Sequence, residues 1–168
     1  MSSGDAEQLT PGWGAPEGEE HSSVRPSRVL IVAHRTAATP KLLEAVEARA
    51  SRGPSVFRLL VPRPYWDPDT EEATATLELA IPLLERASGQ VVLGSIAASD
   101  PLVAVQEALA EAQFDEVIIS TLPRHVSRWL RRDLPHRIEQ LGLPVTVITA
   151  DRSRKAPDPP SAEGTRAK

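Results

Sequence analysis

Two short apolar runs flank a cluster of basic residues between Phe114 and Ala150, and this stretch constrains the fold more than any other. Residues 117–119 and Val145–Thr149 are rich in β-branched side chains, which is typical of strands buried on both faces. Between them lie five arginines, two histidines and one aspartate. In a parallel α/β sheet, ligands bind where the carboxyl end of a strand opens into the following loop. The stretch therefore predicts both a parallel sheet and the position of a site.

The same alternation of strand and helix patterns runs through the preceding part of the chain. Apolar runs at residues 28–34, 56–61 and 91–93 predict three more strands. Helices are predicted to begin near Thr39, Asp69 and Asp100, because threonine and aspartate side chains cap helix N-termini. Pro82 lies inside the second helical pattern and predicts a kink or a break there. The pattern as a whole predicts an α/β fold with a single doubly wound, five-stranded parallel sheet.

Charge divides the chain into three parts. Residues 1–27 contain one basic and five acidic residues, residues 28–151 contain 13 and 16, and residues 152–168 contain five and two. The two end segments have almost nothing to bury, so we predict disordered tails at 1–27 and 152–168 around one domain at 28–151. The net negative charge of that domain argues against a protein that coats nucleic acid.

Several classes of protein are excluded by what the sequence lacks. It contains no cysteine, which excludes disulfides and thiolate-bound zinc. No apolar run approaches the ~20 residues that span a bilayer, and the N-terminus has no secretory pattern. We therefore expect a cytoplasmic protein with no membrane partner.

Four short motifs occur in the order and spacing of a known family. Residues 115–119 match a strand that precedes a phosphate loop, and Ser127-Arg128-Trp129-Leu130 matches a Ser-Arg-Leu-Leu turn. Residues 143–147 match a Cys-Pro-Val strand, and Asp100-Pro101 matches the region of the third helix. In these features residues 28–150 resemble the universal stress protein family. The resemblance implies a flavodoxin-like fold with strand order 3-2-1-4-5. It also implies a homodimer through the last strand, Val145–Thr149, which would be an exposed sheet edge.

The nucleotide-binding motif of that family is not intact in this chain. Members that bind ATP carry Gly-x-x-Gly, nine residues, and then Gly-Ser or Gly-Thr. Here Ser120 and Pro123 stand at the first two glycine positions, and the pair Arg132-Asp133 follows after eight residues in place of the final pair. Proline lacks an amide donor, and a carboxylate competes with phosphate at a helix N-terminus. The family's aspartate after the first strand is replaced by His34-Arg35. ATP or another nucleotide stays a candidate cofactor, but not in the binding mode of the family.

Arginines at helical spacing offer an alternative anion site, since their guanidinium groups can replace the lost glycine amides. A solvated basic face is the competing interpretation, with Val126, Trp129 and Leu130 packing inward. Tyr65-Trp66 is expected on the same cleft rim, either against the ligand or as an anchor of its loop. The candidate ligand-binding residues are His34, Arg35, Thr36, Gly94, Ser120, Thr121, Arg124, His125, Arg128 and Arg132.

Nothing in the sequence supports catalysis. There is no nucleophile elbow and no acid–base couple, and His34 and His125 lack an acidic partner at metal-ligand spacing. The sequence therefore favours a non-catalytic regulatory module that binds a phosphate-bearing small ligand at the carboxyl ends of strands 1 and 4. The alternative is a protein-interaction scaffold with a vestigial nucleotide cleft.

Overall fold

The structure, a computed structural model, describes residues 24–151. The two predicted tails lie outside the described residues except for residues 24–27. The first strand already begins at Ser27, and the last strand is followed by Ala150 and Asp151.

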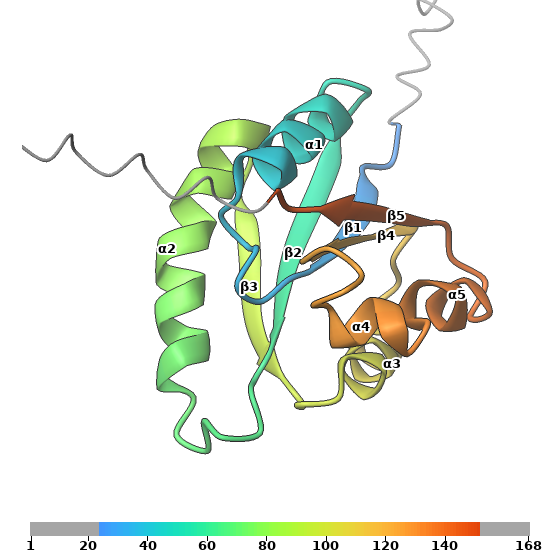
Figure 1. The fold of residues 1–168 in the computed structure, drawn as a ribbon. Coiled ribbons are helices and arrows are strands. Elements are labelled where there is room, and N and C mark those ends of the chain that lie inside the picture. The colour runs from blue at the N-terminus through green and yellow to red at the C-terminus, as the bar shows by residue number, and fades with distance from the viewer. Residues whose placement is uncertain (1–23, 152–168) are drawn as a thin grey trace, which may run out of the picture.

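A single parallel sheet forms the centre of the fold (Figure 1). Its strands lie in the order β3-β2-β1-β4-β5, so the predicted sheet and strand order are confirmed. The strands are β1 (Ser27–Val32), β2 (Ser55–Pro62), β3 (Val92–Ala97), β4 (Glu116–Thr121) and β5 (Val145–Thr149). The order reverses at β1, whose neighbours are β2 and β4, and this is where ligands bind in open α/β sheets.

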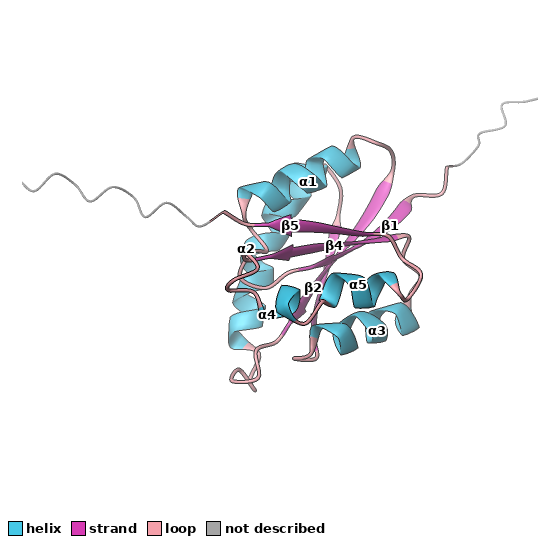
Figure 2. Ribbon diagram, turned by 45° about the vertical axis from the view of Figure 1, so that its right-hand side comes forward, coloured by secondary structure: helices cyan, strands magenta, loops and turns pink. Residues whose placement is uncertain are grey.

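Helices cover both faces of the sheet (Figure 2). One face carries α1 (Pro40–Ala50) and α2 (Glu71–Ser88), and the other carries α3 (Pro101–Glu111), α4 (Arg128–Arg131) and α5 (Leu134–Glu139). Alternate residues of β1 point to opposite faces of the sheet. Val29 and Ile31 pack with α1 and α2, while Leu30 and Val32 pack with α3 and α5. This double burial explains why β1 is an unbroken apolar run.

Two of the predicted helix starts have caps, although only one has the predicted cap. Oδ1 of Asp100 accepts hydrogen bonds from the amides of Leu102 and Val103 at 2.9 and 3.2 Å, as predicted. The second helix is capped by a residue further back: buried Asp67 accepts from the amides of Glu71, Glu72 and Ala73. The predicted cap Thr39 stands at the N-cap position, but its hydroxyl donates to the carbonyl of Thr36 instead.

Two sequence predictions are wrong in detail, and a third is narrowed. Of the kink or break predicted at Pro82, the break does not occur, because the second helix continues through this residue. The third strand is longer than residues 91–93, so Gly94 lies within β3 rather than after it. Val126 is 43% exposed and does not pack inward, because helix α4 begins only at Arg128. Within the described residues, no helix is long and apolar enough to cross a membrane.

Candidate functional site

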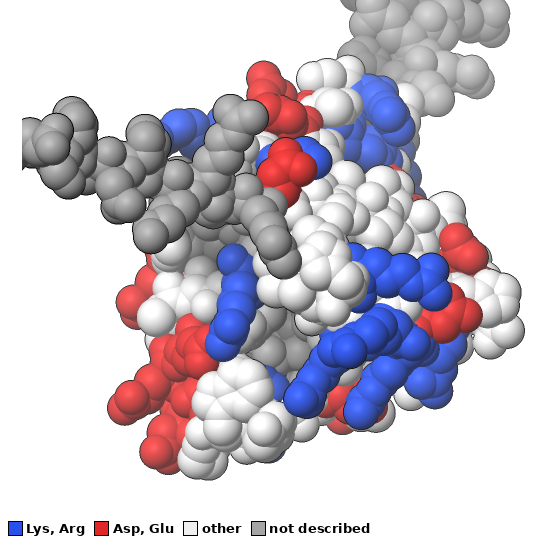
Figure 3. Space-filling model, in the orientation of Figure 1, with Lys and Arg blue, Asp and Glu red and all other residues white. Residues whose placement is uncertain are grey.

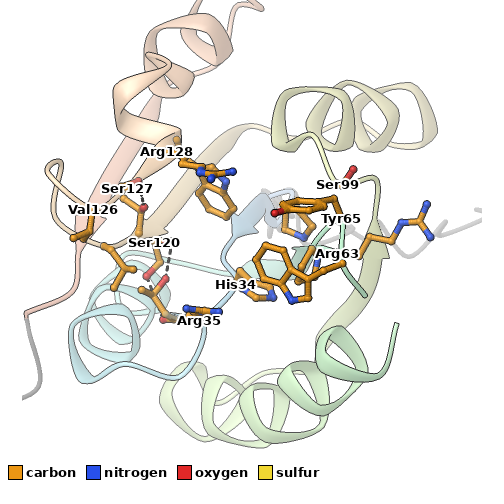
Figure 4. Close-up of a pocket in the computed structure, with 16 residues that line it drawn as sticks. His34, Arg35, Arg63, Tyr65, Ser99, Ser120, Val126, Ser127 and Arg128 are labelled. Atoms are coloured by element: carbon orange, nitrogen blue, oxygen red, sulfur yellow. Dashed lines mark hydrogen bonds between the residues drawn. The ribbon is translucent and has the colours of Figure 1, made fainter. Parts of the chain in front are cut away.

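The carboxyl ends of β1, β2 and β4 open into a pocket of about 210 Å³ (Figure 4). Its walls come from the β1–α1 loop, the β2–α2 loop, the end of β4 and the start of α4. It is lined by His34, Arg35, Thr36, Pro62, Arg63, Pro64, Tyr65, Trp66, Ser99, Ser120, Thr121, Leu122, Val126, Ser127, Arg128 and Trp129.

Buried hydroxyl groups hold two of these walls in place. Thr36 donates its hydroxyl to the carbonyl of Ser120 at 2.7 Å, and Ser120 donates to the carbonyl of Thr36 at 3.2 Å. On the other side, the hydroxyls of Thr121 and Ser127 lie 2.6 Å apart, and Ser127 also accepts from the amide of Leu130. These hydroxyls are therefore engaged in positioning the loops.

Three arginines supply the positive charge of the pocket. Arg35 follows β1, Arg63 follows β2 and Arg128 begins α4. The side chains of Arg35 and Arg128 lie on either side of the opening, whereas that of Arg63 extends away from it, past Tyr65 (Figure 4). Arg35 also forms an ion pair with a carboxylate, since its Nε lies 3.9 Å from Oε1 of Glu72. The guanidinium groups have planar donor geometry that matches phosphate oxygens.

Two aromatic rings form the wall opposite Arg128. Tyr65 and Trp66 pack edge to face, with their centroids 4.9 Å apart and their planes at 85°. Both stay exposed, at 74% and 54%, although they line the pocket. The indole of Trp66 donates to Oε2 of Glu72 at 3.2 Å, which ties this loop to α2. Exposed aromatic faces beside basic groups suit a ligand that has a flat ring and a phosphate.

His34 lies at the base of the pocket with its side chain only 15% exposed. Burial lowers the pKa of His34 below its ordinary value of 6.5; the carboxylate of Glu72 opposes this shift, and Arg35 adds to it. Nε2 of His34 lies 3.5 Å from Oε1 of Glu72 but has no hydrogen-bond partner within the part of the chain that is described. The pocket therefore presents a neutral imidazole near pH 7.

The structure brings together six of the ten predicted site residues. His34, Arg35, Thr36, Ser120, Thr121 and Arg128 line the pocket. Arg132 borders an adjoining hollow instead. Arg124 and His125 stand on the loop between β4 and α4, and neither lines the pocket. Gly94 lies in the middle of β3 beneath α2, where a Cβ would come within 2.5 Å of Cδ1 of Ile81. Its lack of a side chain serves helix packing.

Tyr65 and Trp66 of the β2–α2 loop line the pocket, on the cleft rim where the sequence predicted them, but several of their neighbours were not predicted. Pro62, Arg63 and Pro64 line the pocket beside Tyr65, and Ser99 reaches it from the end of β3. A signal for Arg63 was present, because it directly follows an apolar strand. Among the described residues, no group of three His, Cys, Asp or Glu residues could hold a metal ion.

Neither a protein-family model nor a curated protein sequence matches the chain. Solved structures do match. A universal stress protein in complex with cAMP is 14% identical and has a TM-score of 0.56; the match covers 75% of this chain and 98% of that protein. A universal stress protein from Archaeoglobus fulgidus is also 14% identical, with a TM-score of 0.55, and the match covers 73% and 93% of the two chains. The chain thus has the universal stress protein fold, as its sequence resemblance predicted.

Proposed function

We propose that the chain is a non-catalytic regulatory module that binds a nucleotide in the pocket at the carboxyl ends of β1, β2 and β4. One observation carries the proposal: two guanidinium groups, of Arg35 and Arg128, and two exposed aromatic rings line a single pocket. The rings of Tyr65 and Trp66 would stack on the base, and Arg35 and Arg128 would bind the phosphate. The cAMP bound to a protein of the same fold supports this ligand class.

Side chains would replace the backbone amides that a glycine-rich loop supplies. The loop after β4 contains Pro123, which has no amide hydrogen, and the hydroxyls of Ser120 and Thr121 are engaged in the loop network. Phosphate recognition would therefore fall to the arginines. This arrangement favours one or two phosphate groups near the pocket mouth over a triphosphate wrapped by the loop.

Isothermal titration with cAMP, AMP and ATP tests the proposal. Replacing both Arg35 and Arg128 by alanine is expected to weaken nucleotide binding by about tenfold or more, because charge-assisted hydrogen bonds are lost. Arg124→Ala is the control for loss of a nearby positive charge, since Arg124 stands on the loop before α4 but lies outside the pocket lining. Absence of binding for all nucleotides, or equal losses in the control, would contradict the proposed site and favour the scaffold function.

We also propose that two copies associate through β5. The strand is one edge of the sheet, and its residue Val147 is 38% exposed. An edge strand presents unpaired amide and carbonyl groups along one side, so a second copy can extend the sheet.

A further inference from the structure

A second hollow, of about 320 Å³, adjoins the nucleotide pocket. It lies between the start of α3 and the two short helices α4 and α5. Four residues line both cavities: Tyr65, Ser99, Arg128 and Trp129. Figure 4 shows Arg128 and Tyr65 on opposite sides of the opening, with Ser99 beyond Tyr65. The two cavities therefore lie side by side and share part of their lining.

The second hollow is strongly basic. Arg128, Arg132 and Arg137 line it, and basic side chains gather over α4 and α5 in the space-filling view (Figure 3). None of these three arginines forms an ion pair with another described residue. The one carboxylate in the lining, Asp100, uses its Oδ1 to cap α3. The unneutralised charge favours an anionic ligand.

The size of the second hollow and the apolar residues within its mostly polar lining argue for more than a phosphate chain. The second hollow is larger than the first pocket, which has about 210 Å³. Its lining includes the indole of Trp129 and the apolar side chains of Pro101, Leu102 and Leu134. A chain of phosphates would leave these surfaces without a partner, whereas a base can stack on an indole or on a guanidinium plane. A second nucleoside unit fits both properties.

We infer that the physiological ligand is a dinucleotide, with one nucleoside in each cavity and the linking phosphate at Arg128. This inference rests on the proposed nucleotide pocket and names its ligand class. Arg132 and Arg137 would contact only the second unit, because they line the second hollow and not the first pocket. The net-negative domain makes a long nucleic acid strand a poor ligand, since such binding needs a basic footprint over many phosphates.

Titration of the full chain with AMP, ADP, the linear dinucleotide pApA and a ten-nucleotide single strand tests the inference. The same titrations with the guanine and uracil nucleotides show which base is preferred. The dinucleotide of the preferred base is expected to bind about tenfold tighter than its mononucleotide, which corresponds to one stacked base. Replacing Arg132 and Arg137 together by alanine should abolish this gain and leave mononucleotide affinity unchanged. Arg131→Ala is the matched control, because Arg131 belongs to α4 but lines neither cavity.

Equal affinity for the mononucleotide and the dinucleotide would overturn the inference while leaving the proposed function intact. If ADP exceeds AMP in affinity by as much as the dinucleotide does, the inference is also overturned, because the second hollow would then hold phosphate alone. A ten-nucleotide strand that binds far tighter than the dinucleotide would point to nucleic acid instead. Absence of binding by mononucleotides and dinucleotides alike would remove both proposals together.

Discussion

Thr36 and Ser120 exchange two hydrogen bonds although they lie 84 residues apart: each hydroxyl donates to the backbone carbonyl of the other residue. Both side chains are buried. The pair fastens the β1–α1 loop to the end of β4 and thereby places Arg35 beside the pocket. The sequence suggested these two hydroxyls as ligand contacts, and the structure gives them a role in holding the site together.

Thr36→Val is expected to lower the free energy of unfolding by about 1 to 3 kcal/mol, because the carbonyl of Ser120 loses a buried donor. Urea denaturation measures the change. Thr74→Val is the control, since it makes the same substitution at an exposed position of α2. Equal stability of the two variants would show that the reciprocal bonds do not stabilise the fold.

Asp67→Ala is expected to affect both stability and ligand binding. The buried carboxylate accepts three backbone amides at the start of α2, so its loss should cost about 2 kcal/mol in urea denaturation. The same loop carries Tyr65 and Trp66, so nucleotide affinity measured by titration should fall as well. Asp69→Ala removes an exposed carboxylate from the same loop and should change neither quantity. An Asp67→Ala protein with unchanged affinity would separate the loop from the binding site.

The lowered pKa of His34 predicts a pH-dependent stability. The unfolded chain protonates this histidine at a pKa near 6.5, while the folded chain takes up the proton only at lower pH. More protons are bound to the unfolded state between the two pKa values, so stability falls as the pH drops below about 6.5. His34→Gln should flatten this part of the profile when unfolding is measured from pH 7.5 to 5. A variant profile parallel to that of the wild type would show that other groups cause the decline.

The fold was predictable because its signals are local and repeat along the chain. Each strand of the interior is an apolar run bounded by polar residues, and a parallel sheet is the arrangement that buries all of them. Of the kink or break predicted at Pro82, the break does not occur, because Ala80 and Leu84 pack into the core on both sides of the proline. Tertiary packing thus outweighed a local helix breaker.

The site was only partly predictable because the spacing argument assumed a helix where a turn occurs. Arg124 and Arg128 would share a face of a continuous helix. Instead, the amides of Val126 and Ser127 both donate to the carbonyl of Pro123, and Ser127 caps α4. Arg124 therefore stands before the helix and not on its pocket side. Gly94 is predicted at the cleft because no local sequence pattern indicates that α2 packs over it.

Association through β5 predicts a dimer whose stability depends on the character of this edge. Val147→Lys places a charge on the exposed edge strand, which natural proteins use to prevent strand pairing. Light scattering after size-exclusion chromatography should show twice the monomer mass for the wild type and the monomer mass for the variant. Val91→Lys is the matched control, because Val91 is 72% exposed and directly precedes β3, the opposite edge of the sheet. A monomeric wild type would contradict the proposed dimer. A dimer that is lost only in the Val91→Lys control would place the contact at the opposite edge of the sheet.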